Sequence, residues 1–440
     1  MTAWWTPPSL VRMSSDYPMT GFLVRDHRVQ VPVDWSAPDR FGSIEVFARE
    51  IVDPTKAADD LPLIVYLQGG PGHESPRPMP GSWATKLLER FRVVLLDQRG
   101  TGRSSRVDGR SLERFDDPAV AADYLACFRG DAIVADAEHL RNTVFGGKTW
   151  ATLGQSYGGF LTLTYLSKHP EALTMCLVTG GLPPATATAA QIYSATYDRQ
   201  DARNRELARL HPGDLPVLGA IADVLASGDV VLPDGDPFTV ERLQMLGHPL
   251  GMSTGIDALH WQLEQAFDDD GSLSEGFLRS VSTQTAFDGN PLYAALHEAI
   301  YHQGSVPGGW AAAAEQSARP AYAASSRPLR LTGEVILPWM FDQVRALRPF
   351  RAAVDHLLEP RDWPLLYDLD RLASNEVPVA AVQYYDDPYV DLSLALATPV
   401  GNQQVWITNE YLHDGLRVAG DVIVPKLLDM ATGKARVTSR

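Results

Sequence analysis

Residues 150–160 have the sequence Trp150-Ala151-Thr152-Leu153-Gly154-Gln155-Ser156-Tyr157-Gly158-Gly159-Phe160, a short apolar run that leads into the pattern G-x-S-x-G. The spacing predicts a strand before Ser156 and a helix after it, from Phe160 to Lys168. A serine on such a strand-to-helix turn has a strained backbone and an exposed hydroxyl. Gly154 and Gly158 carry no side chain that would collide with the neighbouring elements. We therefore interpret Ser156 as a nucleophile on a tight turn.

Strands and helices alternate on both sides of this turn. Five further apolar runs have the length of buried parallel strands: 63–67, 93–97, 175–181, 377–385 and 404–408. Helical spacing occurs at 131–145 and again at 416–432. Residues 21–52 alternate as antiparallel strands do, and Pro32 is expected at a sheet edge because it cannot donate to a ladder. The order predicts an α/β fold with a doubly wound, mainly parallel sheet.

The pattern changes near Pro183 and Pro184. From about 187 to 370 the chain has amphipathic helical stretches, few strand-like runs, and loops rich in Gly, Pro and Asp. We expect a helical cap inserted into the sheet. The predicted division is a first part of the core at 1–184, the cap at 185–372 and a second part of the core at 373–440.

Composition limits the class of partner. The 440 residues include 38 Lys and Arg against 54 Asp and Glu, for a net charge of −16. This charge argues against nucleic acid or an anionic membrane as partner. The first 13 residues lack a basic segment followed by an apolar one, and no run of 18 apolar residues occurs. Two cysteines make no disulfide framework. We expect a cytoplasmic protein.

Two more residue types complete a catalytic set in chain order. Ser156 is followed by an aspartate at 386 or 387 and then by His413, each in the loop after a predicted strand. Ser…Asp…His is the order of α/β-hydrolases, in which the histidine is the base and the carboxylate orients it. The spacing leaves Asp386 and Asp387 open. Asp391 is a third candidate.

A glycine-rich loop follows the strand at 63–67, with the sequence Gln68-Gly69-Gly70-Pro71-Gly72. Glycines let a backbone N–H approach a substrate oxygen. We expect the N–H of Gly70 and that of Tyr157 to form an oxyanion hole. His73 also lies in this loop, but it precedes the serine, which is the wrong order for this fold. A phosphate loop is excluded because no G-K-[ST] follows.

Four motifs carry a resemblance to a known family: G-G-P-G at 69–72, D-Q-R-G-T-G-R-S at 97–104, G-Q-S-Y-G-G at 154–159 and H-D-G at 413–415. With them the chain resembles the proline iminopeptidase (prolyl aminopeptidase) family of serine peptidases. The resemblance is closest to the larger members, which have an extended helical cap and Gln before G-G-P-G, as at Gln68.

The resemblance implies release of N-terminal proline from short peptides, with Ser156 as nucleophile and His413 as base. Family members have an Asp-Met step at the acid position. We choose Asp387 because Pro388 falls where that methionine would be, a departure from the family pattern. The resemblance also implies that glutamates of the cap bind the substrate amino group, with Glu298 as first choice, and Glu264 and Glu334 as weaker ones.

Other functions stay open at this point. An esterase or amidase of the same fold could use the same nucleophile, and a noncatalytic binding protein could keep the fold. No H-E-x-x-H pattern or clustered Cys and His suggests zinc, so we expect no metal and no cofactor. Epoxide hydrolases and dehalogenases need a carboxylate at the elbow, where this chain has Ser156.

Overall fold

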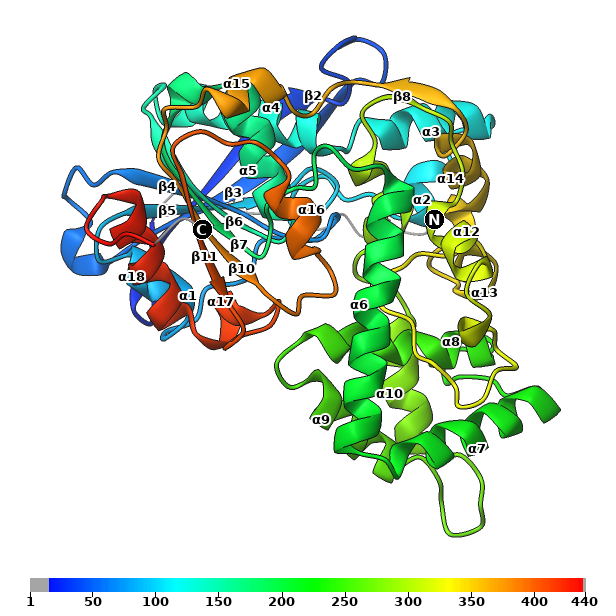
Figure 1. Cartoon of the computed structure of the whole chain (residues 1–440). Helices are drawn as coiled ribbons and strands as arrows, with labels where there is room; N and C mark the ends of the chain where they lie inside the picture. The colour runs from blue at the N-terminus through cyan, green and yellow to red at the C-terminus, as the bar shows by residue number, and fades with distance from the viewer. Residues whose placement is uncertain (1–15, 438–440) are drawn as a thin grey trace, which may run out of the picture.

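A nine-stranded sheet forms the centre of the computed structural model, which describes residues 16–437 (Figure 1). The predicted absence of a leader in the first 13 residues lies outside this range. The strands are β1 (Tyr17–Met19), β2 (Phe22–Pro32), β3 (Ser43–Val52), β4 (Leu63–Leu67), β5 (Arg92–Asp97), β6 (Trp150–Gln155), β7 (Leu173–Thr179), β10 (Val379–Tyr384) and β11 (Gln403–Thr408). Their order across the sheet is β1-β2-β3-β5-β4-β6-β7-β10-β11.

The sheet is antiparallel at one end and parallel over the rest. β1, β2 and β3 pair antiparallel, and β3 also runs antiparallel to β5. The six strands from β5 to β11 are parallel to one another. β1 pairs only with residues 22–24, so Pro32 lies on an open edge as predicted. The predicted fold class is confirmed.

Helices cover both faces of the sheet. Along β4, Leu63, Val65 and Leu67 pack into one hydrophobic cluster, whereas Ile64 and Tyr66 pack into another. This alternation follows from the two-residue period of a strand. The first cluster includes side chains of α3 (Pro118–Ala126), α4 (Gly130–Val144) and α5 (Tyr157–Lys168). The second includes α1 (Trp83–Leu87) and α18 (Gly420–Ala431).

The helix predicted over 416–432 is wrong in one respect. The structure divides it into α17 (Gly415–Val418) and α18, with Ala419 between them at φ −139°. Gly420 approaches α1 so closely that a Cβ there would lie 2.4 Å from the Cβ of Trp83. We attribute the break to this close packing of Gly420 against α1, which lies far away in the sequence.

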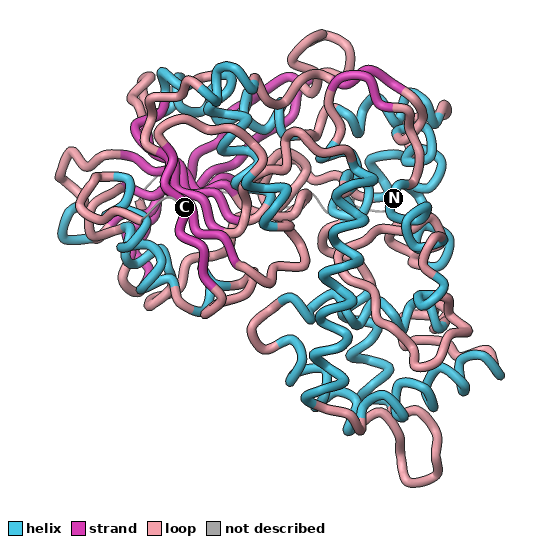
Figure 2. The backbone as a smooth tube through the Cα atoms, viewed as in Figure 1, coloured by secondary structure: helices cyan, strands magenta, loops and turns pink. Residues whose placement is uncertain are grey.

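The segment between β7 and β10 is nearly all helix and loop (Figure 2). Its strands β8 (Gly304–Val306) and β9 (Arg361–Trp363) pair only with each other. Its helices are α6 (Ala189–Leu210), α7 (Asp214–Ser227), α8 (Val240–Gln244), α9 (Gly255–Glu264), α10 (Glu275–Thr285), α11 (Pro291–Leu296), α12 (Ala311–Ser317), α13 (Met340–Gln343), α14 (Arg351–Leu357) and α15 (Leu369–Ala373).

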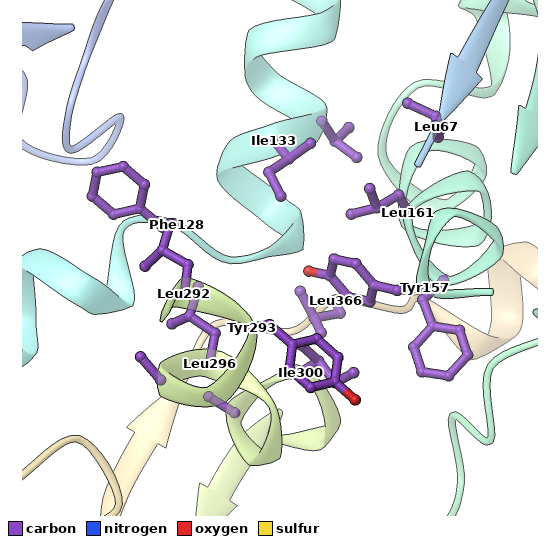
Figure 3. Close-up of a cluster of buried hydrophobic side chains, with 14 of the residues drawn as sticks. Leu67, Phe128, Ile133, Tyr157, Leu161, Leu292, Tyr293, Leu296, Ile300 and Leu366 are labelled. Atoms are coloured by element: carbon purple, nitrogen blue, oxygen red, sulfur yellow. The ribbon is translucent and has the colours of Figure 1, made fainter. Parts of the chain in front are cut away.

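This insertion has two parts with different cores. The end of α6 and helices α7 to α10 enclose a hydrophobic cluster of their own, which we call the distal lobe (lower right in Figure 1). Residues from α11 to α15 belong instead to the cluster that covers the sheet. Figure 3 shows this contact, where Leu292, Leu296 and Ile300 lie beside Phe128 and Tyr157.

Two further observations concern the expectations from composition. Cys127 and Cys176 are free. Within residues 16–437, no helix combines the length and apolar character needed to cross a membrane.

Candidate active site

Ser156 lies between β6 and α5 with φ 56° and ψ −126°, a conformation that residues with side chains rarely adopt. On both sides of the serine the backbone comes very close to neighbouring backbone, and this is possible only because Gly154 and Gly158 lack side chains. A Cβ on Gly158 would lie 1.8 Å from the carbonyl oxygen of Leu67, and one on Gly154 would lie 2.2 Å from that of Gly158. The G-x-S-x-G pattern is therefore a steric requirement of this turn.

Three side chains form a hydrogen-bonded row at the carboxyl ends of the strands. Nε2 of His413 lies 2.8 Å from Oγ of Ser156, and Nδ1 of the same ring lies 2.7 Å from Oδ2 of Asp387. The other carboxylate oxygen of Asp387 accepts the N–H groups of Tyr389, at 2.8 Å, and Val390, at 3.3 Å. Asp386 is exposed, so the structure brings Asp387 rather than its neighbour to the histidine.

The surroundings of His413 favour its protonated, positively charged form, which Asp387 stabilises. Burial acts to lower the pKa of His413, but the charge and hydrogen bond of Asp387, and then the charge of Glu334, raise the pKa above its ordinary 6.5. The ring of Tyr389 lies 4.6 Å from the imidazole, between centroids. The imidazole is therefore fixed on one side by a carboxylate and on another by an aromatic ring.

The glycine-rich loop lies directly over the serine. A Cβ on Gly69 would lie 2.9 Å from the Cβ of Ser156, so Gly69 is the glycine that packs against the nucleophile. Gly70 has φ 134°. Among the described residues, no backbone carbonyl accepts the N–H of Gly70 or that of Tyr157. Both donors are thus free to face a substrate oxygen.

The D-Q-R-G-T-G-R-S motif holds this loop in place. The fully buried carboxylate of Asp97 accepts the N–H of Ser75 at 3.2 Å and pairs with Arg77 at 2.9 Å. The side-chain amide of Gln98 donates to the carbonyl of Gln68 at 2.7 Å. The sequence predicts this motif only as part of the family resemblance, and its role in supporting the loop is seen in the structure.

The three predicted glutamates occupy different environments. Glu264 is exposed on α9. Glu298 is buried, but its carboxylate accepts the N–H of Ala311 at 2.9 Å and so caps the start of α12. Burial raises the pKa of Glu298 to about 7. The structure therefore makes the first-choice residue a helix-capping carboxyl that loses its charge easily.

Glu334 is the glutamate that the structure couples to the catalytic row. It accepts the hydroxyl of Tyr293 at 2.9 Å and lies 3.8 Å from Nε2 of His297. Burial acts to raise the pKa of Glu334, but His297, with further contributions from His248 and His413, holds the pKa at about 2. Glu334 thus keeps a largely buried negative charge that acts on His413.

Three aromatic side chains of the insertion lie near the carboxylate of Glu334, and the sequence analysis assigned them no role in the site. Tyr293 and His297 meet edge to face, as do His297 and Tyr301, with ring centroids 5.1 Å and 6.1 Å apart. Their four-residue spacing places them along one side of the turn from α11 onward. That spacing was visible in the sequence and could have indicated a shared face.

A cavity of about 500 Å³ lies beside the row, with His73, His248, Phe287, Tyr293 and Ile336 among the residues in its wall. The ring of His248 lies 5.5 Å from that of Tyr389, which in turn contacts His413. Burial lowers the pKa of His73 and of His248, so both rings are neutral near pH 7. The wall therefore combines apolar side chains with neutral polar ones, and Asp288 adds one carboxylate.

The fold and this site define a serine hydrolase with the α/β-hydrolase fold. A sequence profile of the alpha/beta hydrolase fold matches residues 62–216. A proline iminopeptidase from Aeromonas sobria is 41% identical over 416 residues, which cover 94% of this chain and 97% of that protein. A proline iminopeptidase from Aspergillus aculeatus is 32% identical over 91% of this chain and 92% of its own.

The chain belongs to the proline iminopeptidase family. A solved proline iminopeptidase from Mycobacterium smegmatis superposes with a TM-score of 0.42 at 15% identity, over 93% of this chain and 100% of its own. The family assignment rests on the two sequence relatives.

Proposed function

We propose that this protein is a serine aminopeptidase that releases N-terminal proline from short peptides. The observation that carries the proposal is the row of Ser156, His413 and Asp387, with a buried, ionised Glu334 close enough to act on the same histidine. A negative charge near the nucleophile can bind the positively charged amino group of a peptide. The bond after the N-terminal residue then lies close to Ser156.

In the first step Ser156 attacks the carbonyl carbon of the N-terminal residue. His413 takes the hydroxyl proton through Nε2, and Asp387 stabilises the imidazolium that forms. The N–H groups of Gly70 and Tyr157 are the proposed donors to the oxyanion. His413 then gives its proton to the leaving amine, and water releases proline from the acyl-enzyme.

Glu334 is the proposed anchor of the substrate amino group. It is ionised, largely buried and held by Tyr293, so it can pair with a cation without reorganising. Glu298 is a secondary candidate, because a nearby cation would favour its charged form. Glu264 is the weakest, since its side chain is exposed on α9.

The test is steady-state hydrolysis of proline β-naphthylamide, of its N-acetylated analogue and of a simple aryl ester. We expect activity on the free amine alone, lost in Ser156→Ala. Glu334→Gln should lower kcat/KM on the free amine on the order of 100-fold, because a buried charge pair loses one partner. Glu264→Gln is the matched control and should change little.

Two outcomes would contradict the proposal. Equal rates on the free and acetylated substrates would show that the amino group is not recognised and would favour a general esterase or amidase. No turnover of any substrate, together with failure of Ser156 to react with a fluorophosphonate, would favour a noncatalytic binding protein.

A further inference from the structure

Two histidines of the distal lobe stack on each other, far along the chain from the catalytic serine. His211 follows the end of α6 and His260 lies on α9, and their rings are 4.1 Å apart at an angle of 9°. Each ring pairs with an aspartate. Nδ1 of His260 lies 2.9 Å from Oδ1 of Asp214, and Nε2 of His211 lies 3.1 Å from Oδ1 of Asp257. Four chemically active side chains thus meet where three helices come together.

Asp214 is the unusual member of this group. Its side chain is only 7% exposed at the start of α7, and Oδ2 is buried without a hydrogen-bond partner. Leaving a buried carboxylate oxygen unpaired costs free energy, so such an atom calls for a ligand. One nitrogen from each histidine and one carboxylate oxygen of Asp214 all lie within 4.8 Å of one another.

The donor set decides which ion would fit. Imidazole nitrogens together with a carboxylate suit Zn²⁺ and neighbouring first-row transition metals, whereas Ca²⁺ and Mg²⁺ prefer oxygen alone. Around Zn²⁺, with bonds of about 2.0–2.2 Å, tetrahedral ligand atoms lie roughly 3.4 Å apart. The three donors therefore need to draw together by at most about 1.5 Å, and one imidazole has to turn out of the stack, because a metal ion lies near the plane of each ring that binds it. Side-chain rotation can supply both changes because both histidines are partly exposed.

We propose that His211, Asp214 and His260 form a binding site for a divalent transition-metal ion, with Zn²⁺ as the best fit. Asp257 then holds the ring of His211, as carboxylates do behind histidine ligands. The ion would join the turn between α6 and α7 to α9 and so brace the distal lobe. The site was not predicted from the sequence, because His260 joins Asp214 only through the fold, from 46 residues away.

The experiment uses the untagged full-length chain, treated with a chelator and dialysed, and titrated with ZnCl₂ by calorimetry. We expect a saturable site of one equivalent and a rise in Tm with added Zn²⁺, because the ion binds only the folded form. His260→Gln should weaken binding at least tenfold and abolish the rise in Tm. His211→Asn should do the same, while both variants keep activity on proline β-naphthylamide as evidence that they fold.

Two controls locate the ion. His356→Gln removes a partly exposed histidine with a carboxylate 3.0 Å away and should bind Zn²⁺ like the wild type. Co²⁺ should quench the fluorescence of Trp261, whose ring lies 4.9 Å from that of His260, and Trp261→Phe should remove this part of the quenching.

The proposal is overturned if the wild type shows no saturable binding, if His260→Gln binds as tightly as the wild type, or if His356→Gln loses as much. It does not depend on the peptidase activity. Ser156→Ala should bind Zn²⁺ unchanged, and binding lost in that variant would place the ion at the catalytic row instead.

Discussion

Asp386 and Asp387 are neighbours in the sequence, but only one of them can act on His413. Asp387 is buried with Oδ2 2.7 Å from Nδ1 of the imidazole, whereas Asp386 faces solvent. Asp387→Asn should therefore lower kcat by about 10⁴-fold, because the amide cannot stabilise the imidazolium or fix its tautomer. Asp386→Asn should stay within about twofold of the wild type. Steady-state kinetics on proline β-naphthylamide would decide, and equal losses would reject the assignment.

The same contact sets the protonation of His413. Its pKa is raised above 6.5, so the ring stays charged to a higher pH than a free histidine and becomes a base only above that pKa. Asp387 is the largest cause that raises it. Asp387→Asn should therefore move the pKa of His413 downward, because the opposing effect of burial remains. NMR titration of the imidazole would measure the change, and an unchanged pKa would contradict the ion pair.

Glu298 should make stability fall as pH rises. The pKa of its carboxyl is 4.5 when free and about 7 in the folded protein, so the folded state binds the proton more tightly. Its contribution is fully present below pH 4.5 and is lost as pH rises through 7, by at most about 3 kcal/mol. Glu298→Gln should remove this slope in urea unfolding, whereas the exposed Glu264→Gln should leave it. Equal slopes in all three proteins would refute the buried carboxyl.

Residue types and their order identified Ser156 and His413, because both follow strands in a known sequence of loops. The order of residues does not predict the direction in which a side chain points. Asp387 could not be separated from Asp386 by spacing, and the glutamate that the structure couples to His413 is Glu334 rather than Glu298. The first choice depends on which side chain turns inward after β10, and the second depends on contacts between the insertion and the core. No local pattern in the sequence encodes either one.

At the scale of elements, one buried ion pair ties the core together. Arg99 is fully buried, and its Nε lies 2.7 Å from Oδ2 of Asp136 on α4, while its Nη1 donates to the carbonyls of both Val33 and Cys127. Asp136→Asn should cost about 3–5 kcal/mol of unfolding free energy, because it leaves a buried guanidinium without its counter-charge.

Urea unfolding would measure that cost. Glu171→Gln is the control, because Glu171 is exposed in a loose pair with His169 and its loss should cost under about 0.5 kcal/mol. A similar small effect from both substitutions would show that Arg99 is held by the backbone carbonyls alone.

The buried strands of the core were predicted within about two residues, because buried parallel strands are short, continuous apolar runs. The failures share a different cause. The break at Ala419 depends on Gly420 against Trp83, and β8 with β9 has only three residues in each strand. The supporting role of Asp97 depends on a loop 20 residues away. Each is a long-range contact rather than a local preference.

At the scale of the whole molecule, the distal lobe has its own hydrophobic cluster and yet touches the catalytic loop. Oγ of Ser253 donates to Asp414 at 2.7 Å, and the N–H of His413 donates to the carbonyl of Gly251 at 3.2 Å. The lobe is therefore a separate packing unit joined to the triad by a short connection.

A separate core implies that the distal lobe can open without unfolding the sheet. Leu218 on α7 is fully buried in that cluster. Leu153 on β6 is fully buried in the cluster between the sheet and helices α1 and α18. Leu218→Ala should cost about 2–5 kcal/mol within the lobe, so hydrogen exchange should speed up in α7, α9 and α10 while β6 stays protected. Leu153→Ala should instead speed exchange throughout the chain, because the sheet holds every other element. If Leu218→Ala exposed β6 as much as α7, the lobe and the sheet would be one cooperative unit, and the connection at Ser253 would transmit unfolding as well as position.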